Sequence, residues 1–179
     1  MITKKYIGAG AYEVQGLGNE ILFPIQSLIP GDEIKFEREN DRLITAAVSH
    51  LPSLLGLFIL NSDYAQTNVD HNQLTRAWAW EWHSDSVNNP QVDCKVILYF
   101  VSEDLTEETG NRICFRKKTE NNEYTYDIKN NSLIVQRSDP HGVYQHKREP
   151  SRKPIKSRII LSMNCLGFDT FLKSVPDAI

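Results

Sequence analysis

The chain lacks the features that mark several specialised protein classes. Its 179 residues carry a formal net charge of −3, so composition does not favour binding to nucleic acid or to a membrane surface. Its three cysteines, Cys94, Cys114 and Cys165, form no C-x-x-C pair, which indicates reduced core thiols. The most apolar segment, residues 51–60, is too short to span a bilayer, and the N-terminus lacks the apolar run of a signal peptide. We therefore expect a cytoplasmic protein without a membrane span.

The length and composition suit one globular domain covering residues 1–179. A hydrophobic share of 40% and a charged share of 24% are ordinary for a soluble protein, and this length can bury a substantial core. The sequence shows no internal repeat or low-complexity tract. It does not indicate an oligomeric state.

Short strand-like segments follow one another through the second half of the chain. They are residues 75–83, 95–101, 112–116, 120–128, 133–136 and 157–163. Their spacing of roughly 10–15 residues, with turn signals between them, favours an all-β sandwich or barrel. In the first half, residues 32–36 and 43–50 are short elements of either type, and the apolar run 49–60 fits a helix or a strand. The polar residues 61–72 are expected to form a connection.

The segment WAWEWHSDS, residues 78–86, combines all three tryptophans with an H-x-D pair. On a strand the tryptophans share one face, where we expect them to pack as an apolar plate, while His83 and Asp85 share the other. Glu81 lies on the histidine face if the strand is regular and points to solvent if a bulge intervenes. Two histidines and one carboxylate on one face of an octahedron are typical of non-haem Fe(II) oxygenases. The second histidine is expected late in the chain, at His141 or His146.

An arginine stands at the start of the last apolar strand. Arg158 shares a face with Ile160, Ser162 and Asn164, and an arginine inside such a strand is costly unless an anion pairs with it. A planar guanidinium suits a carboxylate, so a carboxylate ligand is one interpretation. An edge-strand arginine facing solvent is the other.

The order of these motifs resembles the Fe(II)/2-oxoglutarate dioxygenases, closest to their prolyl-hydroxylase-like branch. The resemblance covers residues 78–165 and includes H-x-D, KVILYFV, TGNRICF, SLIV, a late histidine and Arg158. YQHKREP resembles the family's H-x-V-x-P stretch and favours His146 over His141. TGNRICF stands where the family has a Gly-Gly turn, of which only Gly110 is kept.

The resemblance implies a mainly β fold: a double-stranded β-helix (jelly-roll or cupin-like) barrel, with N-terminal α/β elements packed on one sheet. Residues 73–167 would form the barrel core, 1–72 an N-terminal support and substrate region, and 168–179 a C-terminal tail.

The resemblance also implies the site and the reaction. His83, Asp85 and His146 would be catalytic residues that hold Fe(II), and Arg158 and Tyr99 would bind the far carboxylate of 2-oxoglutarate. With O2, such an enzyme hydroxylates an aliphatic C–H bond of a small molecule or a peptidyl residue and releases succinate and CO2. A carboxylate at Asp85 is inconsistent with the related halogenases, which carry a small residue there.

Two other functions remain open at this point. WHSD followed by a histidine and an arginine also resembles the AlkB-type nucleic-acid demethylases, and the basic run 147–158 suits phosphates. That branch usually has Asn-x-Tyr upstream and a second arginine where this chain has Asn164, so nucleic acid is the less favoured partner. The second alternative is a non-catalytic β-barrel binding module.

Overall fold

The computed structural model describes residues 1–17, 51, 54–68, 81–87, 89–101, 103–153 and 157–179. Trp78, Trp80 and the short elements expected at 32–36 and 43–50 lie outside these residues, and so does most of the strand expected at 75–83.

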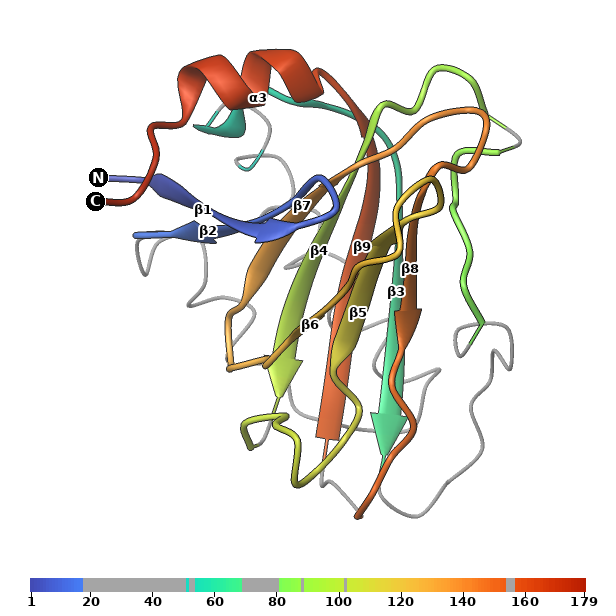
Figure 1. The fold of residues 1–179 in the computed structure, drawn as a ribbon. Coiled ribbons are helices and arrows are strands. Elements are labelled where there is room, and N and C mark those ends of the chain that lie inside the picture. Colours follow the sequence, from blue (N-terminus) through green and yellow to red (C-terminus); the bar gives the residue numbers. More distant parts are fainter. Residues whose placement is uncertain (18–50, 52–53, 69–80, 88, 102, 154–156) are drawn as a thin grey trace.

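Two antiparallel sheets form the body of the molecule (Figure 1). The large sheet has the order β1–β2–β7–β4–β9–β3, made of β1 (Thr3–Gly8), β2 (Ala11–Gln15), β7 (Leu133–Arg137), β4 (Cys94–Val101), β9 (Ser157–Leu166) and β3 (Phe58–Asn68). The small sheet has the order β6–β5–β8, made of β6 (Glu123–Tyr126), β5 (Ile113–Lys117) and β8 (Tyr144–Arg148). The prediction of a mainly β double-stranded β-helix is confirmed.

Strand β4 shows how the sequence divides the core into two layers. All eight of its residues are buried, as expected for a central strand that pairs with β7 on one side and β9 on the other. Val96, Leu98 and Phe100 point to the outer face of the large sheet. Ile97, Tyr99 and Val101 point between the two sheets, where they meet Phe115 and other residues of the small sheet. The inward residues therefore line the barrel interior.

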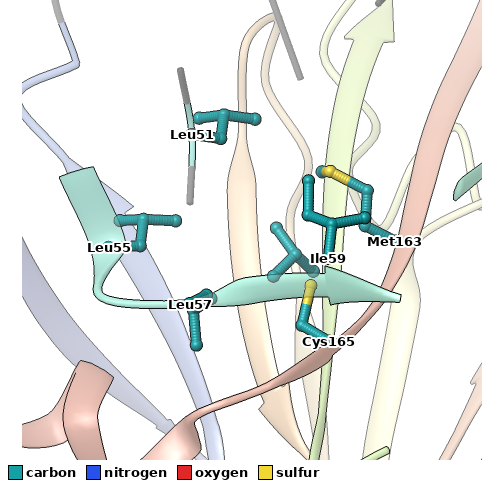
Figure 2. Close-up of a pocket in the computed structure, with 7 residues that line it drawn as sticks. Leu51, Leu55, Leu57, Ile59, Met163 and Cys165 are labelled. Carbon is teal, nitrogen blue, oxygen red and sulfur yellow. The ribbon is translucent and has the colours of Figure 1, made fainter. Parts of the chain in front are cut away.

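The apolar run 49–60, for which the sequence allowed a helix or a strand, contains both in the part that the structure describes. Leu51 and Leu55 are helical and buried, Gly56 has a positive φ of 68° that ends the turn, and β3 begins at Phe58. Figure 2 shows Leu51, Leu55 and Leu57 on the same side of the large sheet as Met163 and Cys165, with which they line a small gap. The gap between them is only about 10 Å³ and is lined by apolar side chains, so it is packing space and not a ligand site.

The prediction that residues 61–72 form a connection is wrong for the part that the structure describes. Strand β3 continues to Asn68 and pairs with β9 as far as Asn68↔Ser157. It is the edge strand of the large sheet, and the hydrogen bonds to β9 come from its backbone whatever the polarity of its side chains. Hydrophobic alternation is therefore a weak signal for this strand.

The two ends of the chain meet at the edge of the large sheet (Figure 1). The segment 168–179, expected to be a tail, begins with helix α3 (Phe168–Ser174), whose Phe168 and Phe171 are buried against the outer face of the sheet. Beyond α3 the chain pairs with β1, where the Lys4 backbone N–H donates to the Pro176 carbonyl over 2.8 Å. Among the described helical residues, none belongs to a helix long and apolar enough to cross a membrane.

Candidate metal centre and anion site

Three side chains of metal-ligand type converge at one end of the barrel. One ligand atom from each of His83, Asp85 and His146 can be chosen so that all three lie within 4.8 Å of one another. The Nε2 atom of His146 lies 3.5 Å from the Asp85 carboxylate, and the two imidazole rings are 4.4 Å apart between centroids. His146 is buried, while His83 and Asp85 are half-buried. The arrangement is that of two imidazoles and a carboxylate facing one point.

Backbone pairing with β8 places His83 beside His146. The His83 backbone N–H donates to the His146 carbonyl over 3.1 Å, and the His146 N–H donates back over 3.0 Å. Asp85 lies beyond this bridge in a turn, which Ser86 anchors by donating to the Asp139 carbonyl over 2.7 Å. The carboxylate of Asp139 accepts N–H groups of its own loop, including that of Val143. The side chains of His83 and Asp85 thus lie close together, although only His83 pairs with a strand and Asp85 belongs to a turn.

Hydrogen bonds fix the tautomer of both histidines. His83 Nδ1 lies 2.8 Å from the Glu81 carbonyl, an acceptor only, so the ring proton is on Nδ1 and the lone pair is on Nε2. His146 Nδ1 lies 2.9 Å from the Gln136 Oε1. The amide nitrogen of Gln136 donates to the Gln145 carbonyl over 3.1 Å, which orients the amide and again leaves the lone pair of His146 on Nε2.

The described surroundings keep both imidazoles neutral. Burial lowers the pKa of His146 well below its ordinary value, and the charges of Lys95 and His83 lower it further. Burial also lowers the pKa of His83, opposed by its bond to the Glu81 carbonyl. Neutral imidazole is the form that binds a metal ion.

A buried lysine contacts the carboxylate of this group. Lys95 follows Cys94 on β4, faces the interior, and its ammonium group forms an ion pair with the Asp85 Oδ2. The Asp85 Oδ2 therefore lies between the Lys95 ammonium group and Nε2 of His146. The sequence reading did not select Lys95, because a lone lysine in an apolar strand gave no indication of its partner.

Tyr99 and Arg158 lie together further inside the barrel. Both are buried, and the Arg158 guanidinium lies 5.5 Å from the centre of the Tyr99 ring. Burial raises the pKa of Tyr99, with the charge of Arg158 opposing the shift. Burial lowers the pKa of Arg158. Arg158 therefore points inward and not to solvent.

Sequence reasoning missed a second buried arginine beside this pair. Arg148 faces inward on β8 two residues after His146, and its guanidinium donates to the Asn111 Oδ1 from Nε over 2.9 Å and from Nη2. Burial lowers the pKa of Arg148 to about 9, and the charge of Arg158 contributes to this shift. Within the described residues, no carboxylate forms an ion pair with either arginine. Residues two apart on a strand face the same way, so the position of Arg148 relative to His146 could have indicated an inward side chain. The sequence did not indicate that residues 144–148 form a strand.

Other candidate residues lie elsewhere. His141 is exposed on a loop and is not part of the three-residue group. The side chain of Glu81 is exposed, so its position at a bend turns it to solvent. The half-buried ring of Trp82 has two cationic neighbours, Arg116 and Lys147, each 4.6 Å from a ring centroid. The expected tryptophan plate itself lies outside the described residues, because it depends on Trp78 and Trp80.

The described part of the basic run 147–158 does not form an open cationic patch. Arg148 and Arg158 are buried in the barrel. On the surface, Arg152 pairs with Glu149 over 3.1 Å, and Lys153 pairs with Glu108 over 2.9 Å. These contacts satisfy the charges within the chain, so they do not favour the phosphate-binding interpretation.

Comparison with known proteins identifies the fold. No family model and no curated protein matches the chain. Among solved structures, a prolyl 4-hydroxylase from Phytophthora capsici matches with a TM-score of 0.55 at 15% identity, over 95% of this chain and 62% of that one. A Trichoplax adhaerens prolyl hydroxylase in complex with a hypoxia-inducible-factor peptide matches with a TM-score of 0.47 at 18% identity, over 77% and 61%. A 2OG-Fe(II) oxygenase family oxidoreductase from Burkholderia pseudomallei matches with a TM-score of 0.43 at 11% identity, over 91% and 65%.

The chain spans 61–65% of the length of these structures. At 15% identity, the match to the Phytophthora enzyme establishes architecture and not activity. Together with the sheet order, it shows that this chain has the double-stranded β-helix fold found in prolyl 4-hydroxylases.

Proposed function

We propose that this chain is an Fe(II)- and 2-oxoglutarate-dependent dioxygenase that hydroxylates an aliphatic C–H bond of a small molecule or a peptidyl residue. The observation that carries the proposal is the convergence of His83, Asp85 and His146, with ligand atoms within 4.8 Å, at one end of a barrel whose interior also holds Arg158.

The donor set fits Fe(II). Two neutral imidazoles and one carboxylate form the facial triad that non-haem iron sites use, and three ligands leave positions open for a chelating co-substrate and oxygen. Both imidazole protons are on Nδ1, so the lone pair that binds a metal is on Nε2 of each ring. The Asp85 carboxylate would bind the metal with the Lys95 ammonium group beside it.

The buried cation fits the co-substrate. Within the described part of the chain, the Nε–H of Arg158 has no hydrogen-bond partner, and Tyr99 lies beside it inside the barrel. A guanidinium binds a carboxylate through charge-assisted hydrogen bonds, and burial makes each bond stronger than in water. We assign Arg158 and Tyr99 to the far carboxylate of 2-oxoglutarate.

The residues of the chain supply orientation and exclusion of water. Gln136 and the Glu81 carbonyl hold the two imidazoles in place, and Ser86 holds the turn that carries Asp85. Ile97 and Phe115 line the barrel with apolar surface and limit water beside the anion site. When iron and 2-oxoglutarate are bound, they supply oxidation by O2 with release of succinate and CO2.

Turnover of 2-oxoglutarate tests the proposal. We expect the purified chain to release succinate only when Fe(II) is present, and His83→Ala and Asp85→Ala to abolish this release. His141→Ala should keep wild-type turnover, since that exposed residue lies outside the group. A mass-spectrometric search of metabolite and peptide pools for products that gain one oxygen atom would then identify the substrate class. Succinate release that persists in His83→Ala would contradict the proposal.

A further inference from the structure

The anion site of this barrel contains more cationic donors than one arginine provides. Two positions where the sequence departs from the pattern it resembles meet there: Asn111, in place of the second glycine of a Gly-Gly turn, and Arg148, in place of the valine of H-x-V-x-P. They are 37 residues apart in sequence and hydrogen-bonded in the structure.

Backbone conformation holds Asn111 in position to orient Arg148. Asn111 has a positive φ of 59°, a conformation that asparagine tolerates better than most residues. Its side-chain oxygen accepts hydrogen bonds from Nε and Nη2 of Arg148, so one edge of the guanidinium group is bound to Asn111. Nη1, on the other side of the guanidinium group, takes no part in this contact with Asn111.

Among the residues that the structure describes, three buried hydrogen-bond donors in this region have no hydrogen-bond partner. They are Asn111 Nδ2, Arg148 Nη1 and Arg158 Nε, and their residues have exposed fractions of 0%, 7% and 5%. Unsatisfied buried donors are rare in folded proteins, and each normally indicates an absent acceptor. Here all three atoms are donors and two carry positive charge, so the absent acceptor is an anion.

We propose that Arg148 and Arg158 bind one carboxylate together, with Asn111 Nδ2 as a third donor, and that this carboxylate is the far end of 2-oxoglutarate. The identity of the anion rests on the proposed function. Arg148 lies close enough to Arg158 and to Tyr99 for their charges to interact, so the three side chains occupy the same part of the barrel interior. A carboxylate offers about four lone-pair sites, enough for these donors. Two adjacent buried guanidinium groups also repel each other until an anion lies between them.

With two arginines in the site, the affinity for a 2-oxo acid should depend strongly on whether that acid carries a second carboxylate. We expect the site to prefer 2-oxoglutarate over 2-oxobutyrate, which has the same metal-chelating end but lacks the far carboxylate. Arg148 would then determine co-substrate specificity, with Asn111 as its positioning residue.

Calorimetric titration of the Mn(II)-loaded chain tests this assignment. We expect Arg148→Met to raise the Kd for 2-oxoglutarate about tenfold or more, as loss of a charged hydrogen bond predicts, and to leave the Kd for 2-oxobutyrate within about twofold. Asn111→Asp keeps the size of the side chain but gives Arg148 an internal counter-ion, so it should weaken 2-oxoglutarate binding similarly. The control Arg152→Met removes a surface cation and should bind like the wild type.

Two outcomes would overturn the assignment. One is a folded Arg148→Met variant that binds 2-oxoglutarate within twofold of the wild type. If that variant does not fold, the deciding result is wild-type affinity in Asn111→Asp.

Melting curves of the metal-free chain with glutarate distinguish this inference from the proposed function. Glutarate cannot chelate a metal through a keto group, so we expect it to raise the Tm of the wild type and not of Arg148→Met. If glutarate acts in this way but Fe(II)-dependent turnover is absent, the anion site stands and the dioxygenase proposal fails. If turnover is present but neither substitution changes binding, the dioxygenase proposal stands and Arg148 has no part in anion binding.

Discussion

The ammonium group of Lys95 forms an ion pair with the Asp85 carboxylate, on the oxygen that lies 3.5 Å from His146 Nε2. Lys95 and Asp85 have side-chain exposures of only 11% and 17%, so water screens this pair weakly. The cation therefore lies where it both orients the proposed metal ligand and competes with a metal for it.

Replacement of Lys95 should separate its effect on stability from its competition with a metal for Asp85. Lys95→Met leaves Asp85 without its partner, so we expect the metal-free chain to lose about 3 kcal/mol of unfolding free energy. The same variant should bind Mn(II) about tenfold more tightly, because a positive charge beside the site is removed. Urea unfolding and metal titration measure the two quantities. Lys147→Met, which removes an outward-facing cation near His146, is the control, and unchanged Mn(II) affinity in Lys95→Met would contradict the expectation.

The hydrogen bond from His146 to Gln136 should control metal affinity. Gln136→Leu removes the acceptor for His146 Nδ1, so the ring can rotate or change tautomer, and we expect Mn(II) affinity to fall about 10–100-fold. Gln136→Glu keeps an acceptor at this position and should bind Mn(II) more tightly than Gln136→Leu. Equal affinities of Gln136→Leu and the wild type would show that the amide does not orient the ring.

His83 and His146 should make the metal-free chain sensitive to acid. Their pKa values are lowered in the folded state, so below the ordinary pKa of 6.5 the unfolded chain binds protons that the folded chain does not. Stability should therefore be constant above about pH 7.5 and fall as the pH decreases through about 6.5 toward the lowered values. Melting curves at several pH values measure this. His146→Gln should reduce the slope, and a slope of opposite sign would be inconsistent with neutral imidazoles at these two positions.

The turn before β5 should not tolerate a side chain at Gly110. Its φ is +67°, and an added Cβ would meet the Pro150 carbonyl oxygen. We expect Gly110→Ala to lower the unfolding free energy by at least about 2 kcal/mol, from backbone strain and the clash together. Asn131→Gly, at a positive-φ position of another turn, is the matched control and should change stability by less than about 1 kcal/mol. Wild-type stability of Gly110→Ala would require a different turn geometry.

The cysteines should be unreactive in the folded chain. All three are buried and unpaired in disulfides, and contact with Cys165 together with burial raises the pKa of the Cys94 thiol. We expect a thiol reagent at about pH 8 to label none of them before unfolding and three afterwards. Ser151→Cys, at an exposed position, should label at once and serves as the positive control. Rapid labelling of one native cysteine would contradict this burial.

The strands that could be predicted from the sequence are those whose pattern of apolar and polar side chains matches their burial. The buried run of β4 and the alternating face of β9 follow directly from side-chain periodicity, and Arg158 and Tyr99 lie on the inward faces of these strands. Strand β3 was missed because an edge strand is held by backbone hydrogen bonds to β9. Strand β8 was missed because its sequence YQHKR shows no apolar alternation.

The sequence by itself determined the local chemistry: an H-x-D pair, a late histidine, a tyrosine on a buried strand and an arginine at the start of another. Only the tertiary structure decided which distant groups share one site, because the register between paired strands is a property of the whole sheet. That register brings His146 beside His83, and not His141, and it gives Asp85 a lysine partner. It also brings Asn111 to Arg148, a contact between two positions that look unrelated along the chain.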